Sequence, residues 1–163
     1  MIQFGRETRL KGIKLSDGII LAKVCMFNDD RHKNIPSYQI EKEDIQEEKK
    51  RVEDAIKIAA AQLEKIIEDV ESRVGIAESK IFVAQKMILE DATVHDDIFN
   101  GIGQNNVNAE SAVTRVMDSY ESRLLDVDDE YIRARATDIG EINKRIMDIL
   151  AEMNPSTFLC SGV

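Results

Sequence analysis

Hydrophobic residues recur every three or four positions through most of this chain, from Glu41 to Ile149. This spacing places them along one side of an α-helix, so the pattern predicts amphipathic helices that bury one face. No proline interrupts residues 37–154, which lie between Pro36 and Pro155. Because a proline inside a helix removes a hydrogen bond and clashes with the preceding turn, this interval is predicted to be a helical body.

Four helices are predicted within this body. The first spans about 41–74 and ends at Gly75, and the second spans 78–89, with a continuation over 93–101 beyond a kink near Glu90 and Asp91. The third starts after Asn108, a good N-cap residue. The fourth starts near 128–130, where three acidic side chains suit a helix N-terminus. The loop before the third helix is predicted from Gly101, Gly103, Asn105 and Asn106.

Three of these helices carry a clear buried stripe. In the first, the stripe comprises Val52, Ile56, Ala59, Leu63, Ile66, Val70 and Val74. In the third, it comprises Val113, Val116, Met117, Tyr120 and Leu124. In the fourth, it comprises Ile132, Ala136, Ile139, Ile142, Ile146 and Ile149. Amphipathic rods joined by short connections are expected to form an antiparallel bundle or paired helical hairpins.

The two ends of the chain differ from the helical body. Residues 12–27 are apolar and β-branched around a Ser16-Asp17-Gly18 turn, which predicts two short strands. An isolated strand pair is marginal in water, so these strands are expected to need a sheet supplied from elsewhere. Residues 154–163 are short and apolar. The pattern is typical of the opening part of a longer protein.

Composition narrows the function classes. The chain of 163 residues has 22 Lys and Arg against 31 Asp and Glu, a formal net charge of −9. Nucleic-acid binding is not expected, since it requires a basic face. The longest apolar run, residues 18–22, is far shorter than a bilayer span of roughly 20 residues. No secretory signal pattern is visible, and Cys25 and Cys160 do not form a disulfide framework, so a reduced, cytoplasmic protein is expected.

Candidate chemistry is sparse. His32 and His95 have no metal-ligand or nucleophile pattern near them and are interpreted as solvated surface residues, and the Glu-x-x-His pairs of di-iron bundles are absent. Phosphate-loop, nucleophile-elbow and zinc-protease motifs are also absent. Cys25 is expected in a strand core. The acidic runs 41–44 and 47–51 are interpreted as solvated helix faces with i,i+4 ion pairs. No catalytic or metal-binding residue and no cofactor is therefore predicted.

Four segments nevertheless match one family in order and spacing. They are GIKLSDGIILAKVCMF (12–27), IFVAQKMILED (81–91), NVNAESAV (106–113) and DDEYIRARATDIGEINKRI (128–146). The last is the most specific, with an Asp-x-Glu-Tyr-x-x-x-Arg-Ala-x-Asp-Ile pattern followed by a Lys-Arg pair. Over about Leu10 to Leu150, the chain resembles the N-terminal region of enzyme I of the bacterial phosphoenolpyruvate-dependent sugar phosphotransferase system, which is a phosphoenolpyruvate-protein phosphotransferase.

The resemblance implies a mainly α fold: a four-helix antiparallel helical-hairpin bundle with short N-terminal β-strands that belong to an incomplete swivelling α/β phosphohistidine domain. Residues 1–36 would be the strands of that domain, 37–154 the helical docking domain, and 155–163 the return to the phosphohistidine domain. The parent enzyme would carry its phosphorylated histidine in a downstream Gly-Gly-x-Thr-Ser-His motif. Phosphoenolpyruvate and magnesium would bind a C-terminal barrel. The chain alone is expected to be inactive.

The resemblance also implies that the helical body docks the histidine-containing phosphocarrier protein in sugar uptake. Carried over by position, the docking residues are Gln85, Met87, Ile88, Asp91, Ser119, Leu124 and Arg135. Met87 and Ile88 could instead be core, although adjacent residues cannot both face inward on one helix. Arg135 could instead tie helices together through Asp138 or Glu141.

The chain departs from the family at several positions. Gln85 replaces a histidine found in some relatives, and Ala77, Ala92 and Thr93 replace acidic residues that meet the basic face of the carrier. Two alternatives therefore stay open: a related phosphorelay protein of the nitrogen-regulatory or dihydroxyacetone-kinase branch, or a free-standing, non-catalytic helical interaction module. The oligomeric state is not predicted.

Overall fold

The computed structural model describes residues 36–153 together with Gly18. Several predicted features lie outside the described residues: the strands over 12–27, the segment 154–163, Cys25, Cys160 and His32. The proposed division into domains at Pro36 and Asn154 therefore stays a prediction.

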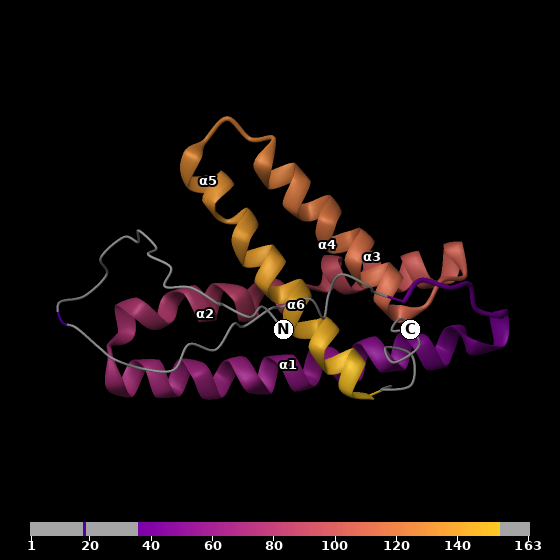
Figure 1. Ribbon diagram of the computed structural model, residues 1–163, viewed down its shortest axis with the longest axis horizontal. Helices are drawn as coiled ribbons and strands as arrows, with labels where there is room; N and C mark the ends of the chain where they lie inside the picture. The colour runs from indigo at the N-terminus through magenta and orange to yellow at the C-terminus, as the bar shows by residue number, and fades with distance from the viewer. Residues whose placement is uncertain (1–17, 19–35, 154–163) are drawn as a thin grey trace, which may run out of the picture.

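The described part of the chain is almost entirely helical, which confirms the mainly α prediction. A short 3-10 helix, η2 (Lys42–Asp44), leads into α1 (Ile45–Arg73), and α2 (Ile76–Leu89) returns alongside α1 (Figure 1). Gly75 lets the chain reverse here, because its φ of 149° is one that residues with a side chain rarely adopt. A Cβ at this position would also lie 2.8 Å from Glu78 Oε2.

The second predicted helix is in fact two helices. α2 ends at Leu89, and α3 (Ala92–Asn105) begins after a turn at Glu90 and Asp91. The carboxylate of Asp91 accepts hydrogen bonds from two backbone N–H groups in the first turn of α3. This N-cap starts a new helix, so the kink predicted at this point is a complete interruption.

The loop predicted over 101–106 is misplaced. α3 continues through Gly101 and Gly103, and the chain turns only at Asn106, whose φ of 48° is left-handed. Gly101 lies within α3 where the next helix is close: a Cβ there would lie 3.7 Å from Ala112 Cβ, an ordinary packing distance. The glycine and asparagine residues that predicted a loop therefore stand mostly at the C-terminal end of a helix.

α4 (Ala109–Leu125), α5 (Glu130–Ala134) and α6 (Ala136–Met153) complete the described chain. Asn108 stands at the N-cap of α4 as predicted, although its side chain does not cap the helix. The fourth predicted helix is divided at Arg135 into α5 and α6. Ile132 consequently leaves the predicted stripe and is partly exposed on α5, whereas the stripe from Ala136 onward is buried.

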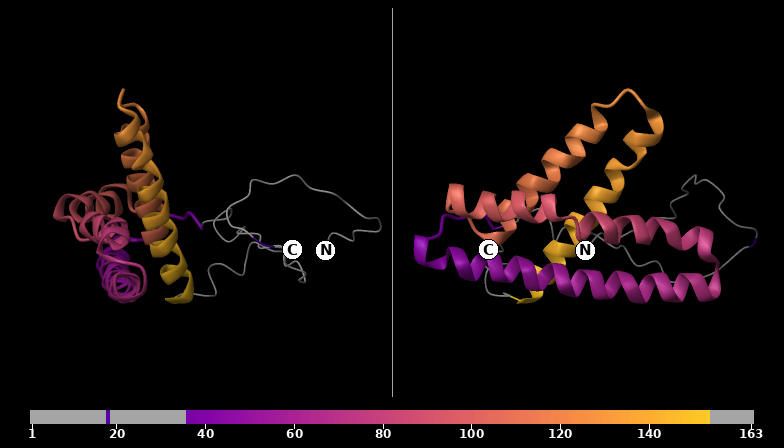
Figure 2. Two further views of the ribbon diagram at one scale, coloured as in Figure 1. Left: turned by 90° about the vertical axis from the view of Figure 1, so that its left-hand side faces the viewer. Right: turned by 180° about the vertical axis from the view of Figure 1, so that it is seen from behind.

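The helices form two layers that cross. α1, α2 and α3 form one layer, and the α4–α6 hairpin crosses it at an angle, as the end-on view in Figure 2 shows. α6 packs on α1 and α4 packs on α3. The buried core between the layers is built almost wholly from aliphatic side chains, the largest of which are Leu63, Leu89, Ile98, Ile102, Met117, Ile142, Ile146, Met147 and Leu150.

The stripe predicted on α1 is correct over its first half and drifts over its second. Val52 and Leu63 are fully buried, but Ile67 is more buried than Ile66 and Val74 is 67% exposed. An α-helix has 3.6 residues per turn, so a stripe extrapolated at fixed steps rotates away from its partner over several turns. The end of α1 also extends beyond the crossing with α6 (Figure 1).

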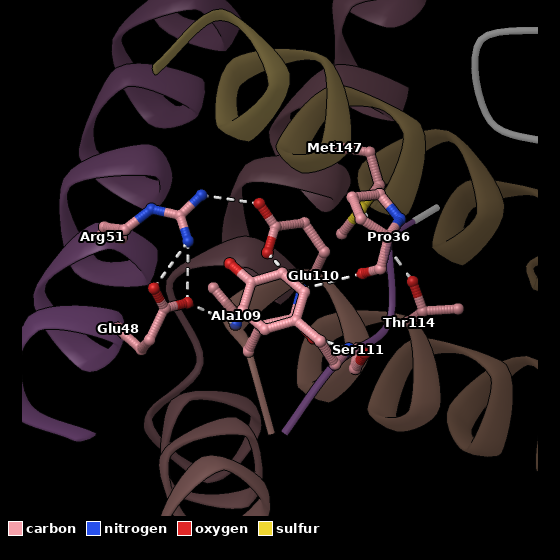
Figure 3. A network of polar contacts seen from close by, with 10 residues as sticks. Pro36, Glu48, Arg51, Ala109, Glu110, Ser111, Thr114 and Met147 are labelled. Atoms are coloured by element: carbon pink, nitrogen blue, oxygen red, sulfur yellow. Dashed lines mark hydrogen bonds and ion pairs between the residues drawn. The ribbon is translucent and has the colours of Figure 1, made fainter. Parts of the chain in front are cut away.

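The run 47–51 is only partly the solvated face that the sequence suggested: Glu47 and Lys50 are exposed, but Glu48 and Arg51 are not. Arg51 Nη1 donates to Glu48 Oε2 over 2.7 Å, and Arg51 Nη2 donates to Glu110 Oε1 over 2.6 Å. Glu110 is fully buried, and Glu48 also accepts the backbone N–H of Ala109 at the start of α4 (Figure 3). These contacts, the ion cluster, join α1 to the base of α4.

Electrostatics within the ion cluster favour the charged guanidinium. Burial acts to lower the pKa of Arg51, but its hydrogen bonds to Glu110 and Glu48 outweigh burial and raise that pKa. Tyr38 lies at the edge of the cluster, and burial followed by the charges of Glu48 and Glu110 raises its pKa.

The segment before the helices, residues 36–40, is hydrogen-bonded to the same region of the protein. Ile40 N–H donates to Asn106 O over 2.8 Å, and Asn108 N–H donates to Tyr38 O over 3.2 Å. The Asn108 side chain adds a bond from Nδ2 to Pro36 O, also drawn in Figure 3. The loop between α3 and α4 therefore holds the start of the helical body in register.

Within residues 36–153, no helix is long and apolar enough to cross a membrane.

The ion cluster predicts the effect of removing its cation. Arg51→Met should lower the free energy of unfolding by about 3–5 kcal/mol, because it leaves two carboxylates without a countercharge in a buried site. Urea unfolding followed by far-ultraviolet circular dichroism measures the change.

Lys57→Met is the matched control, since Lys57 forms an exposed ion pair with Glu53 on the same helix. This control should unfold at nearly the wild-type urea concentration. Equal unfolding midpoints for the two variants would contradict a stabilising role for the cluster.

Candidate functional site

Large apolar side chains are exposed where α2 ends and where α5 lies. Met87 on α2 is 69% exposed and Tyr131 on α5 is 70% exposed, and Leu125, Val127 and Ile132 are also exposed near α5. The four exposed residues around α5 lie within eight positions of one another, and such a group marks a contact with a partner more often than a scattered apolar residue does. We therefore built the candidate site from the residues around α2, α4 and α5.

A chain of polar contacts fixes α2, α5 and α6 to one another. Gln85 is buried on α2, and its Nε2 donates to Asp138 Oδ1 over 3.4 Å. The other carboxylate oxygen of Asp138 accepts Arg135 Nη1 over 3.3 Å. Arg135 Nη2 donates to the hydroxyl of Tyr131 over 2.7 Å, with the guanidinium carbon 4.9 Å from the ring centroid.

These polar contacts explain the charge state of Arg135. Its hydrogen bonds to Tyr131 and Asp138 raise the pKa of Arg135, so the guanidinium is a permanent charge. The predicted tie between Arg135 and Asp138 is thus confirmed, while 41% of the Arg135 side chain stays exposed. The exposed part of Arg135 and the part of Tyr131 that Arg135 does not cover remain accessible to a partner.

The junction between α2 and α3 is held by two side chains. Asp91 Oδ1 accepts Thr93 N–H over 2.8 Å and Val94 N–H over 3.3 Å. The bond from the Thr93 backbone is the main reason that the pKa of Asp91 is lowered. His95 Nε2 donates to Leu89 O over 2.7 Å, and its ring lies 6.4 Å from that of Phe99. His95 is therefore half-buried and structural, which corrects its interpretation as a solvated residue.

A third polar contact joins α3 to α4. The hydroxyl of Tyr120 donates to Asp97 Oδ2 over 2.9 Å. Burial, followed by the hydrogen bond to Asp97, raises the pKa of Tyr120, and the charge of Asp91 adds to the same shift. Asp91, Asp97 and Tyr120 therefore lie near one another, at the point where α2, α3 and α4 approach.

The predicted docking residues fall into three groups by burial. Met87, Asp91 and Ser119 are exposed. Ile88 and Leu124 are half-buried against the core, and Arg135 is half-exposed. Gln85 is buried and acts as a tie between helices. The expectation that Met87 and Ile88 cannot both face inward is confirmed; contact of any of the seven with a partner stays a prediction.

Sequence reasoning missed the polar contacts of Tyr131, Tyr120 and His95. A signal for Tyr131 was present, because it precedes Arg135 by four residues and lies one helical turn away. No local signal existed for the Tyr120 contact, since Asp97 lies on a different helix. Among residues 36–153, no three His, Cys, Asp or Glu side chains converge as metal ligands would.

Comparison with known proteins identifies the family and the relatives that this chain resembles. The sequence matches the family described as "PEP-utilising enzyme, N-terminal" over residues 11–135. It is 35% identical over 140 residues to the phosphoenolpyruvate-protein phosphotransferase of Enterococcus faecalis, covering 85% of this chain and 24% of that protein. It is 31% identical over 141 residues to that of Listeria monocytogenes, covering 86% of this chain and 24% of that protein. The chain thus spans about a quarter of these relatives.

Two solved structures share the fold. The solution structure of an enzyme I protein, nEIt, superposes with a TM-score of 0.70 and 28% identity, over 72% of this chain and 48% of that chain. The N-terminal domain of Enzyme 1 - Nitrogen superposes with a TM-score of 0.66 and 22% identity, over 72% of this chain and 49% of that chain. The second likeness shows the fold alone.

The Asp91 cap predicts a pH-dependent contribution to stability. The folded-state pKa of Asp91 is lowered, so its carboxylate stabilises the fold above the pKa of an unfolded aspartate, about 3.9. This contribution is lost as the pH falls through the lower, folded-state pKa. At pH 7 the urea midpoint should fall in Asp91→Ala and fall less in Asp91→Asn, which keeps an oxygen acceptor.

Below the folded-state pKa, the wild-type protein should lose its advantage over Asp91→Asn. Urea unfolding of the three proteins at a series of pH values checks this order. A pH-independent difference between wild type and Asp91→Asn would contradict a role for the Asp91 charge.

Proposed function

Because the chain belongs to the PEP-utilising enzyme, N-terminal family, we propose that it is the docking part of a phosphoenolpyruvate-protein phosphotransferase. The parent enzyme passes a phosphoryl group from phosphoenolpyruvate to its own histidine and then to the histidine of a phosphocarrier protein. The helical body binds that carrier. The observation that carries the proposal is Met87, which is 69% exposed on α2 between the buried Gln85 and the buried Leu89.

The docking surface comprises the side chains predicted to contact the carrier, with Tyr131 added from the structure: Met87, Ile88, Asp91, Ser119, Leu124, Tyr131 and Arg135. Met87 and Tyr131 supply apolar area, and Arg135 supplies a fixed charge. Interfaces of this kind gain affinity from a few large anchors and association rate from the charges around them.

Rigidity of this surface serves the chemistry. Phosphoryl transfer between two imidazoles requires both rings to be held in line, so positioning supplies much of the rate. The contacts of Gln85, Asp138 and Arg135 lock α2 to α6, and the Asp91 cap and His95 lock α2 to α3. A carrier bound to a locked surface presents its histidine in one orientation.

The reacting groups are assigned to other parts of the parent enzyme. The histidine acceptor belongs to the family motif Gly-Gly-x-Thr-Ser-His, which this sequence does not contain. Magnesium would assist phosphoenolpyruvate chemistry in a C-terminal domain. The described residues of this chain provide no convergent metal ligands, so none is assigned to that ion. We place the protein in the cytoplasm, where sugar uptake by this system begins.

The first test is loss of carrier binding. Met87→Ala should weaken binding of the histidine phosphocarrier encoded in the same genome about tenfold, because truncating an anchor side chain costs 1 kcal/mol or more. Titration calorimetry measures the dissociation constant, and NMR chemical-shift changes should map to Met87, Ile88, Leu124 and Arg135.

Ile76→Ala is the matched control, because Ile76 is 70% exposed at the opposite end of α2. It should bind like the wild type. If a nitrogen-regulatory or dihydroxyacetone-kinase carrier binds and the sugar carrier does not, the protein serves that branch instead. Failure of every carrier to bind would favour a non-catalytic interaction module.

The second test concerns activity. The 163-residue chain incubated with magnesium and labelled phosphoenolpyruvate should incorporate no phosphate, because the acceptor histidine and the substrate domain are missing. Acid-labile label on this chain, detected after gel electrophoresis under neutral conditions, would overturn the assignment of the chemistry to other domains.

A further inference from the structure

Two residues that fix the candidate site are too enclosed to make the contact with a partner themselves. Gln85 is buried on α2, and the side chain of Asp138, in the first turn of α6, is 9% exposed. Gln85 binds Asp138, and Asp138 binds Arg135, which stands at the break between α5 and α6. Gln85 was predicted to dock the carrier, so a role in docking has to reach the surface through these contacts.

The carboxylate of Asp138 has one oxygen for each neighbour. Its Oδ1 accepts Gln85 Nε2 over 3.4 Å, and its Oδ2 accepts Arg135 Nη1 over 3.3 Å. The backbone keeps Asp138 close to Arg135, because Asp138 N–H donates to Arg135 O over 3.0 Å. The carboxylate therefore joins a buried amide to a half-exposed cation.

Arg135 carries this restraint to the surface. Its Nη2 donates to the hydroxyl of Tyr131 over 2.7 Å, and its guanidinium carbon lies 4.9 Å from the centroid of the Tyr131 ring. A guanidinium is a rigid plane with five N–H groups. With one N–H directed at Asp138 and another at Tyr131, the plane is fixed. The remaining N–H groups then point in constant directions on a side chain that is 41% exposed.

Of the three neighbours, Asp138 has the strongest hold on the orientation of Arg135. The bond to Tyr131 is shorter, but Tyr131 is 70% exposed and can move together with Arg135. Asp138 is enclosed on α6, and a hydrogen bond between ions is roughly twice as strong as one between neutral groups. The bond from Gln85 to Asp138 is longer than the usual range of roughly 2.7–3.2 Å, so Gln85 contributes less.

We propose that Asp138 is a positioning residue for docking: it orients Arg135, and through it Tyr131, toward the phosphocarrier, while Gln85 fixes the carboxylate from inside. This inference rests on the proposed function, because it states how one part of the docking surface is held ready for the carrier. The carrier then contacts Arg135 and Tyr131, and the effect of Asp138 and Gln85 on binding is indirect.

Asp138→Asn tests the proposal, because it keeps the size of the side chain and removes its charge. It should weaken binding of the histidine phosphocarrier encoded in the same genome about fivefold, since the acceptor for Arg135 becomes neutral. Titration calorimetry measures the dissociation constant. The control is Glu141→Gln, which removes the same charge from an exposed side chain on α6 that pairs with Lys144. Its effect should stay below about twofold.

A double-mutant cycle separates positioning from a general loosening of the fold. In an Arg135→Met background, Asp138→Asn should not weaken binding further, because the guanidinium that Asp138 orients is no longer there. Equal weakening in both backgrounds would assign Asp138 a purely structural role and overturn the inference. Far-ultraviolet circular dichroism checks that each variant is folded at the temperature of the titration.

The free protein supplies a readout that needs no carrier. The NMR signal of Arg135 Nε–H is shifted by the neighbouring ring of Tyr131. In Asp138→Asn this signal should move toward that of a freely exposed arginine, and in Gln85→Met it should move less in the same direction. An unchanged signal in Asp138→Asn would overturn the inference.

The outcomes distinguish this inference from the proposed function. If Met87→Ala weakens binding while Asp138→Asn behaves like Glu141→Gln, docking stands and the positioning role is excluded. If no carrier binds the wild type, the proposed function fails and the docking role of Asp138 fails with it, whether or not the Arg135 signal moves.

Discussion

One guanidinium shared between two buried glutamates holds the two layers of this protein together. Arg51 lies on the first long helix, and Glu110 lies in the first turn of α4. Packing of aliphatic stripes drives the helices together, but apolar contact is non-directional and tolerates sliding. The ion cluster tolerates little sliding, because separation would leave charges unpaired in a largely buried site. It therefore fixes where α4 begins relative to α1, and with it the position of every residue further along the α4–α6 hairpin.

The docking surface depends on breaks in the helices as much as on the helices themselves. A single helix through residues 78–105 would carry Asp91 and Asp97 on a straight rod. Instead, the helix is interrupted at Asp91, a new helix begins there, and Asp97 on that helix accepts the hydroxyl of Tyr120 on α4. The break at Arg135 similarly turns α5 away from the core, which exposes Tyr131 and Ile132. Interrupting a helix costs backbone hydrogen bonds, and in both places polar side chains replace part of what is lost.

On the docking surface, exposed apolar side chains lie next to side chains that are held by hydrogen bonds. Met87 and Tyr131 remain accessible, while Gln85, Asp138 and Arg135 form hydrogen bonds directly beneath or beside them. Such an arrangement limits the entropy lost on binding, because the anchors are already held in place by the fold. Under the proposed function two imidazoles are aligned for phosphoryl transfer, and a rigid surface serves that task better than a large one.

The sequence by itself determined the helical body, the positions of most buried aliphatic residues and the break near Glu90. These features follow from periodicity and capping, which act over a few neighbouring residues. It also supplied the family resemblance and hence the proposed docking residues, including the exposed Met87. Only the tertiary structure decided that Glu48 and Arg51 are buried, that Gly101 packs against Ala112, and that Gln85 is internal. Each of these depends on a partner far away in the chain, and no local pattern of charge or hydrophobicity records which distant residue will lie opposite.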